Sequence, residues 1–165
     1  MKILGIDPGS LICGYGVVFY QNNKLTLVEY GVVNLKKKSE DFPLRLKEIY
    51  YRISEVIERN RPDYSAFENV FYSKNVQSLV KLSSARASAI LAATLKDIPI
   101  AEYSPREVKK SVTGNGNASK EQVQFMVKNI LNIQETNEFY DATDALAVAI
   151  CHSFKMLLPQ SQAKS

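Results

Sequence analysis

The chain has 165 residues, of which 45% are apolar and 23% are charged, a composition typical of one globular domain with a substantial core. Its net charge of +4 is compatible with binding to nucleic acid but does not identify that function. No stretch approaches the roughly 18 apolar residues of a membrane span, and no signal peptide is recognisable, so we expect a cytoplasmic protein. Two cysteines, Cys13 and Cys151, lie in apolar surroundings and are expected to be buried, reduced thiols.

The first third of the chain is typical of an antiparallel meander. Residues 3–7 and 14–20 are rich in β-branched, aromatic and apolar side chains, which favour strands. A turn at 21–24 leads into a third strand at 25–33, whose side chains alternate in character. A charged loop, which contains Lys36, Lys37 and Lys38, follows the meander.

The remainder of the chain alternates helices with strands. Apolar residues at helical spacing predict a helix over 42–60, a short strand follows to residue 68, and a helix rich in small residues is expected over 73–95. A strand at 98–103 precedes a short helix that opens at Ser104 and Pro105 and runs to Lys110. A capping-box pattern at Ser119 starts a helix to about 131, and the final helix is expected from about 140 to 158.

This order of elements predicts an α/β fold. Three antiparallel strands, followed by strands that helices connect through right-handed crossovers, form a mixed five-stranded sheet flanked by helices. We expect one domain over residues 1–158 and a disordered tail over 159–165.

Four carboxylates stand where core-forming segments meet the surface. Asp7 ends the first strand, Glu68 ends the fourth, and Asp141 and Asp144 lie three apart near the start of the last helix. Positions three apart share a helix face, and neighbouring parallel strands end at one edge, so all four side chains are expected to gather. Their mutual repulsion would then favour hard divalent cations.

Such a site suggests metal-assisted chemistry on phosphate. Two magnesium ions about 3.5–4 Å apart can activate a water and stabilise the leaving oxygen of an in-line displacement. Asp7 is the best candidate to bridge both ions because it comes from the central strand.

Several motifs together resemble the RuvC family of bacterial Holliday junction resolvases, in order and over roughly residues 1 to 155. The motifs are GIDPGS at 5–10, GYGV at 14–17, ENVF at 68–71, KL at 81–82, AR at 85–86, VK at 108–109, GNGNASKEQV at 114–123 and DATDALA at 141–147. Any single motif is weak evidence, whereas their combination is specific.

The resemblance implies an RNase H-like fold and a homodimer that cuts four-way DNA junctions during recombination and repair. It implies four metal ligands, which are Asp7, Glu68, Asp141 and Asp144, and two Mg²⁺ ions per subunit, with Mn²⁺ as an alternative. It places DNA contacts at Phe71, Arg86, Lys109 and Lys120. It also suggests the branch-migration proteins RuvA and RuvB as partners.

The sequence departs from the family pattern at three positions: Leu11 and Cys13 replace a common Arg and Thr, and Ser88 replaces a frequent Gly. None of them is one of the acids, so the departures bear on substrate handling and not on the chemistry.

Each candidate residue also has an ordinary structural interpretation. Asp7 could form a turn before Pro8, and Asp141 could interact with the helix dipole. Arg86 is either a surface charge or a DNA contact, and Phe71 is either part of the core or a stacking platform for an unpaired base. His152 is expected to be a surface or core histidine, since it lies about 12 Å along the helix from Asp144.

Two other functions stay open at this point. One is a related nuclease that acts on other branched DNA or on structured RNA, and the other is a junction-binding module without activity.

Overall fold

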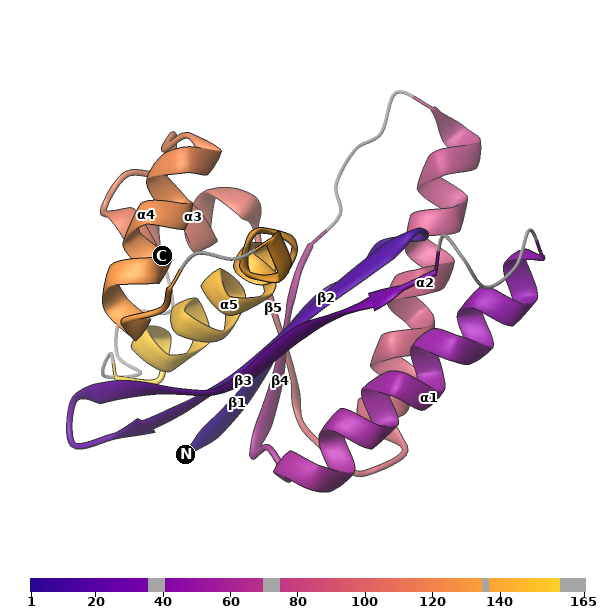
Figure 1. Cartoon of the computed structure of the whole chain (residues 1–165), viewed down its shortest axis with the longest axis horizontal. Coiled ribbons are helices and arrows are strands. Elements are labelled where there is room, and N and C mark those ends of the chain that lie inside the picture. Colours follow the sequence, from indigo (N-terminus) through magenta and orange to yellow (C-terminus); the bar gives the residue numbers. More distant parts are fainter. Residues whose placement is uncertain (36–40, 70–74, 135–136, 158–165) are drawn as a thin grey trace, which may run out of the picture.

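The computed structural model describes residues 1–35, 41–69, 75–134 and 137–157. They form one five-stranded sheet in the order β3-β2-β1-β4-β5, with helices on both faces (Figure 1). The strands β1, β2 and β3 are antiparallel, whereas β4 and β5 run parallel to β1, which confirms the predicted mixed sheet. The strands are β1 (Lys2–Asp7), β2 (Ile12–Gln21), β3 (Lys24–Asn34), β4 (Tyr64–Glu68) and β5 (Ile100–Tyr103). The helices are α1 (Phe42–Asn60), α2 (Val76–Thr94), α3 (Pro105–Thr113), α4 (Lys120–Leu131) and α5 (Asn137–Lys155).

The central strand β1 separates two hydrophobic cores. Because side chains alternate along a strand, Ile3 packs into the core that α3, α4 and α5 cover, while Leu4 and Ile6 pack into the core beneath α1 and α2. All three side chains are fully buried, and each such burial contributes about 1.5–3 kcal/mol. The alternation also directs Asp7, which follows Ile6, toward the α5 side of the sheet.

Small residues of α2 pack against the sheet and α1. Ala85, Ala89, Ala92 and Ala93 are buried in the core that α1 and α2 share. The Ser88 hydroxyl donates a 2.6 Å hydrogen bond to the carbonyl of Leu46 in α1. Ser88, one of the departures from the family pattern, therefore helps to hold the two helices together.

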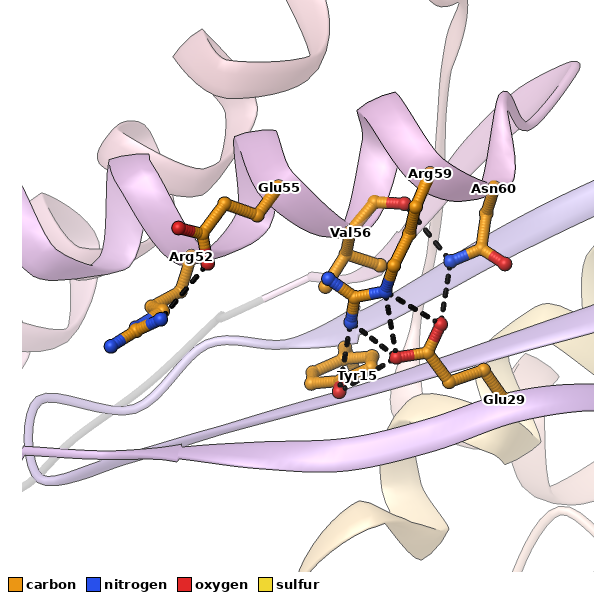
Figure 2. Close-up of polar contacts among 7 residues, drawn as sticks. All are labelled: Tyr15, Glu29, Arg52, Glu55, Val56, Arg59 and Asn60. Atoms are coloured by element: carbon orange, nitrogen blue, oxygen red, sulfur yellow. Dashed lines mark hydrogen bonds and ion pairs between the residues drawn. The ribbon is translucent and has the colours of Figure 1, made fainter.

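A polar cluster fixes the end of α1 over the β2–β3 hairpin. In Figure 2, Arg59 and Asn60 extend from α1 to Glu29 of β3, beside Tyr15 of β2. Arg59 Nε and Asn60 Nδ2 donate to Glu29 Oε2 over 2.9 and 2.7 Å, and the Tyr15 hydroxyl donates to Oε1 over 3.0 Å. Bonding to Arg59, with support from Asn60 and Tyr15, lowers the pKa of Glu29 to about 2, so the carboxylate stays ionised.

The last helix, α5, lies across the other face of the sheet, and α3 and α4 pack beside it (Figure 1). Its approach depends on a glycine in β1: a Cβ at Gly5 would lie 1.9 Å from the carbonyl oxygen of Ala145. Only a residue without a side chain therefore allows this helix to lie so close to the sheet.

Element boundaries differ modestly from the predicted ones. Helix α3 continues to Thr113 instead of ending at Lys110, because Gly114 terminates it in the left-handed conformation, with φ of 78°. Helix α5 begins at Asn137 and not near residue 140, so the polar residues Asn137 and Glu138 belong to its first turn.

Parts of the prediction lie outside the described residues. They are the lysine loop at 36–38 and the tail at 159–165. Within the described ranges, no helix combines the length and the hydropathy that crossing a membrane requires.

Candidate active site

Asp7 and Glu68 lie at the same edge of the sheet. Ile6 pairs with Phe67 in parallel register, so the acid that follows each of them ends its strand beside the other. Burial places Ala66 of β4 in the core beneath α5, and Glu68, two residues on, faces the same side as Asp7. Both acids are half-buried. The structure therefore brings together the two strand carboxylates that the sequence predicted to be neighbours.

A second glycine brings α5 to this edge. Gly14 pairs with Asp7, and a Cβ at Gly14 would lie 2.7 Å from the backbone oxygen of Asp141. The start of α5 thus crosses directly beside Asp7. Asp144 is one helical turn further along, with 38% of its side chain exposed. Asp141 is exposed.

Three of the four acids interact strongly. Burial, with a further contribution from Asp144, raises the pKa of Asp7 from 3.8 to about 6. Burial and then the charges of Asp7 and Asp144 raise the pKa of Glu68 from 4.5 to about 7. Asp7 and Glu68 thus lose their protons at a higher pH than ordinary carboxyl groups do, unless a cation compensates their charge.

Two lysines provide part of that compensation. Lys120 Nζ lies 3.3 Å from Asp144 Oδ2, and its charge lowers the pKa of Asp7. The charge of Lys109 lowers the pKa of Glu68. Both lysines are predicted DNA contacts, but the ion pair between Lys120 and Asp144 was not predicted from the sequence.

Glu68, Asp144 and the two lysines line a cleft of about 280 Å³, which we call the carboxylate cleft. Its lining residues are Glu68, Pro105, Val108, Lys109, Lys120, Val123, Asp144 and Ala147. Apolar side chains from α3, α4 and α5 form one wall, and the charged groups converge from β4, α3, α4 and α5. The cleft therefore combines a partly dry wall with opposite charges, an arrangement suited to a phosphodiester and its counter-ions.

The oxygen atoms of these carboxylates are the kind of ligand that magnesium prefers. Among the described residues, no three His, Cys, Asp or Glu side chains lie together closely enough to form a complete metal cage. Magnesium does not require one, because it commonly uses one or two carboxylates together with waters and substrate phosphate oxygens. The raised pKa values of Asp7 and Glu68 and the ammonium beside Asp144 show a site that favours added positive charge. The donor set therefore fits Mg²⁺ completed by substrate.

Arg86 lies beside this edge but is already bonded. Its Nη2 donates to Asn69 Oδ1 over 3.3 Å and pairs with Glu102 of β5, and only 18% of its side chain is exposed. Since Asn69 directly follows Glu68, this arrangement favours a role in holding the end of β4.

Of the remaining candidate residues, Phe71 falls outside the described residues. His152 is a core histidine, as expected: it is 4% exposed, and its Nδ1 shares a 2.7 Å hydrogen bond with the Tyr103 hydroxyl.

The sequence reasoning missed the contribution of Gly5 and Gly14. Glycine inside a strand often marks a close approach of another backbone, and that signal was present in the printed sequence. The two glycines determine how closely Asp141 and Asp144 approach the strand acids.

Comparisons with known proteins agree with this geometry. The family model described as crossover junction endodeoxyribonuclease RuvC matches residues 3–152. The RuvC protein of Geotalea uraniireducens is 50% identical over 158 residues, which cover 96% of this chain and 91% of that protein. The RuvC protein of Cytophaga hutchinsonii is 49% identical, over 93% of this chain and 76% of that protein. A solved structure of T. thermophilus RuvC in complex with a Holliday junction substrate is 34% identical, covers 94% of each chain and superposes with a TM-score of 0.87.

Proposed function

Since this chain belongs to the RuvC family of crossover junction endodeoxyribonucleases, we propose that it resolves four-way DNA junctions at the carboxylate cleft. The observation that carries the proposal is the electrostatic coupling of Asp7 with Glu68 and Asp144, of which the last two line one cleft together with two lysines. Ordinary surface acids would not show it. Paired nicks across the junction would release two duplexes during recombination and repair.

The four acids would have different roles in metal binding because they lie at different positions in the fold. Asp7, on the central strand, and Glu68 would hold the metal most directly, and Asp144 and the exposed Asp141 of α5 would act on it through bound waters, since no three of the described acids lie close enough together to form a cage. Two Mg²⁺ ions, or Mn²⁺ in their place, would supply an activated water and stabilise the leaving oxygen. Metal binding requires Asp7 and Glu68 in their ionised forms, so the pKa values of these two carboxyl groups determine the pH range in which the site binds the ion.

Lys120 and Lys109 hold the substrate in this scheme. Lys120 is 61% exposed at the mouth of the cleft and balances Asp144 in the free protein. When metal neutralises the acids, its ammonium becomes available to a phosphate. Lys109 contributes a second positive charge beside Glu68. Both contacts would position the strand without distinguishing bases.

A synthetic mobile four-way junction tests this function directly. Nicks should appear at matching positions on two opposing strands with Mg²⁺ and be absent when EDTA replaces it. A flap, a linear duplex and a structured RNA should be cut far more slowly. Nicking that persists without a divalent cation, or equal cleavage of the flap or the RNA, would contradict the proposal.

The exposed face of α2 is the surface through which we expect the chain to form a homodimer. Val76, Val80, Leu91 and Leu95 are 73%, 58%, 49% and 59% exposed and fall on one side of the helix. The buried alanines of α2 do not belong to this face, because Ala85 and its buried neighbours pack on the opposite side of the helix. A stripe of large apolar side chains of this kind commonly marks an interface.

Substituting Leu91→Lys would place a charge within this stripe. We expect the variant to sediment as a monomer where the natural chain sediments as a dimer, and to leave singly nicked junctions. The change Leu44→Lys on α1, where the side chain is 51% exposed, serves as a matched control. A dimer that persists in Leu91→Lys would remove this face as the interface.

Two further assignments follow from the family resemblance. RuvA and RuvB, the branch-migration proteins, would deliver the junction to the cleft. The cytoplasm, where bacterial DNA is located, would be the site of action.

A further inference from the structure

A second hollow lies on the other side of α4 from the carboxylate cleft. It has a volume of about 510 Å³ and is lined by Thr113, Asn115, Ala118, Gln122, Phe125 and Met126, together with Glu121. The lining comes from the end of α3, the loop that follows and the first two turns of α4. We call this hollow the α3–α4 groove.

Phe125 gives the groove an exposed aromatic wall. The side chain is 64% exposed, although it lies in the middle of a regular helix whose Val123 and Val127 are buried. An isolated exposed phenylalanine would need no explanation. An exposed aromatic side chain that lines a hollow, by contrast, is typical of a binding surface.

The polar groups of the groove disfavour phosphate and favour an uncharged, planar ligand. Among the described residues that line it, Glu121, an anion, is the only charged one, and none of them is Lys or Arg. Gln122 uses its carbonyl oxygen to accept a 2.8 Å hydrogen bond from the backbone of Ser119, so its amide nitrogen can donate to a ligand. Asn115 likewise accepts from the backbone of Asn117 over 2.9 Å. Amide donors and a carboxylate acceptor beside an aromatic ring match the edge and face of a nucleobase.

Helix α4 alone separates the groove from the carboxylate cleft, so that one DNA strand could reach both. Lys120 and Val123 of α4 line the carboxylate cleft, while Gln122 and Phe125 line the groove. The helix between them is about 10–12 Å across, a distance that about three base steps of a strand can cover at about 3.4 Å each.

We propose that the α3–α4 groove binds one nucleobase of the strand whose phosphate enters the carboxylate cleft, with Phe125 stacked on its face. This inference rests on the proposed function and adds a second, uncharged contact to it. Because stacking involves the face that every base has, while Gln122, Asn115 and Glu121 contact its edge, the groove would favour some bases without excluding the others.

Replacing Phe125 tests the proposal in the intact protein. Junction affinity is measured by fluorescence anisotropy in EDTA, so that no strand is cut. We expect Phe125→Ala to weaken binding about tenfold, equivalent to about 1.4 kcal/mol. Phe125→Trp, which keeps an aromatic ring, should bind the junction as tightly as the natural chain does. Tyr51→Ala, which removes a 53% exposed aromatic ring from α1 on the opposite face of the sheet, is the matched control and should not change affinity.

Abasic sites identify the base. A series of junctions, each lacking one base within four positions of the cut, is bound by the natural chain and by Phe125→Ala. At one position the abasic site should weaken binding of the natural chain about tenfold and leave that of Phe125→Ala unchanged, since both changes remove the same contact.

Two results would overturn the proposal. One is junction affinity in Phe125→Ala equal to that of the natural chain, which would leave the groove to an apolar side chain of a partner protein. The other is an additive loss at every abasic position. Either result would leave Mg²⁺-dependent nicking intact, whereas failure of the proposed function would abolish nicking by the natural chain itself.

Discussion

Asp7→Asn should stabilise the protein while abolishing its activity. The natural carboxylate ionises with difficulty, because burial and Asp144 raise its pKa from 3.8 to about 6. In the unfolded chain, where Asp7 is exposed to water, its pKa keeps its ordinary value. Ionisation of Asp7 at pH 8 therefore costs about 3 kcal/mol of folding free energy, since each pKa unit corresponds to about 1.36 kcal/mol.

The sign and the pH range follow from proton linkage. Between about pH 4 and pH 6 the folded chain retains a proton that the unfolded chain has released, so the stability of the natural protein falls as pH rises. An asparagine does not titrate. The advantage of Asp7→Asn should therefore grow from about 1 kcal/mol at pH 4.5 to about 3 kcal/mol at pH 8.

Urea denaturation at both pH values, in EDTA, measures the effect. Asp97→Asn makes the same chemical change at an exposed residue and serves as the control. Adding Mg²⁺ at 100 times its dissociation constant should stabilise the natural chain by about 2.7 kcal/mol, and Asp7→Asn by less. An equal advantage at pH 4.5 and pH 8, or an unstable Asp7→Asn protein, would refute the reasoning.

Three further predictions concern DNA binding, packing and pH. Lys109→Ala should make the negative slope of log affinity against log salt concentration shallower by about one, as measured by anisotropy. Lys24→Ala, on the distant β2–β3 turn, should leave this slope unchanged. Gly5→Ala should destabilise the fold by about 3 kcal/mol or more in urea denaturation, because a Cβ there would lie 1.9 Å from the Ala145 oxygen; a loss below about 1 kcal/mol would contradict the packing described. At low Mg²⁺ concentration the cleavage rate should rise between pH 6 and pH 7, since Asp7 and Glu68 must lose protons with pKa values of about 6 and about 7; a flat profile would exclude them as the titrating groups.

The strand acids could be predicted because their signals are local. An apolar run that ends on Asp7, and another that ends on Glu68, mark strand ends directly in the sequence, and parallel pairing places such ends together. The mixed sheet followed from the order of strand and helix patterns, which the structure confirms.

Contacts between distant segments could not be predicted in this way. Nothing local indicates that Arg86 pairs with Glu102, or that Lys120 lies beside Asp144, since both pairs depend on how helices pack on the sheet. The sequence does not distinguish the buried face of α2 from its exposed face, because small residues occur all around this helix. The predicted start of α5 was wrong because its first two residues, Asn137 and Glu138, are polar and precede the apolar period of the helix.

Anomalous diffraction from a crystal soaked in Mn²⁺ would test the central claim most directly. We predict a peak within bonding distance of the carboxylate oxygens of Asp7 and Glu68, with Lys120 Nζ displaced from Asp144, and no such peak in Asp7→Asn crystals. Mn²⁺ bound only elsewhere, with no peak beside Asp7 and Glu68, would contradict it.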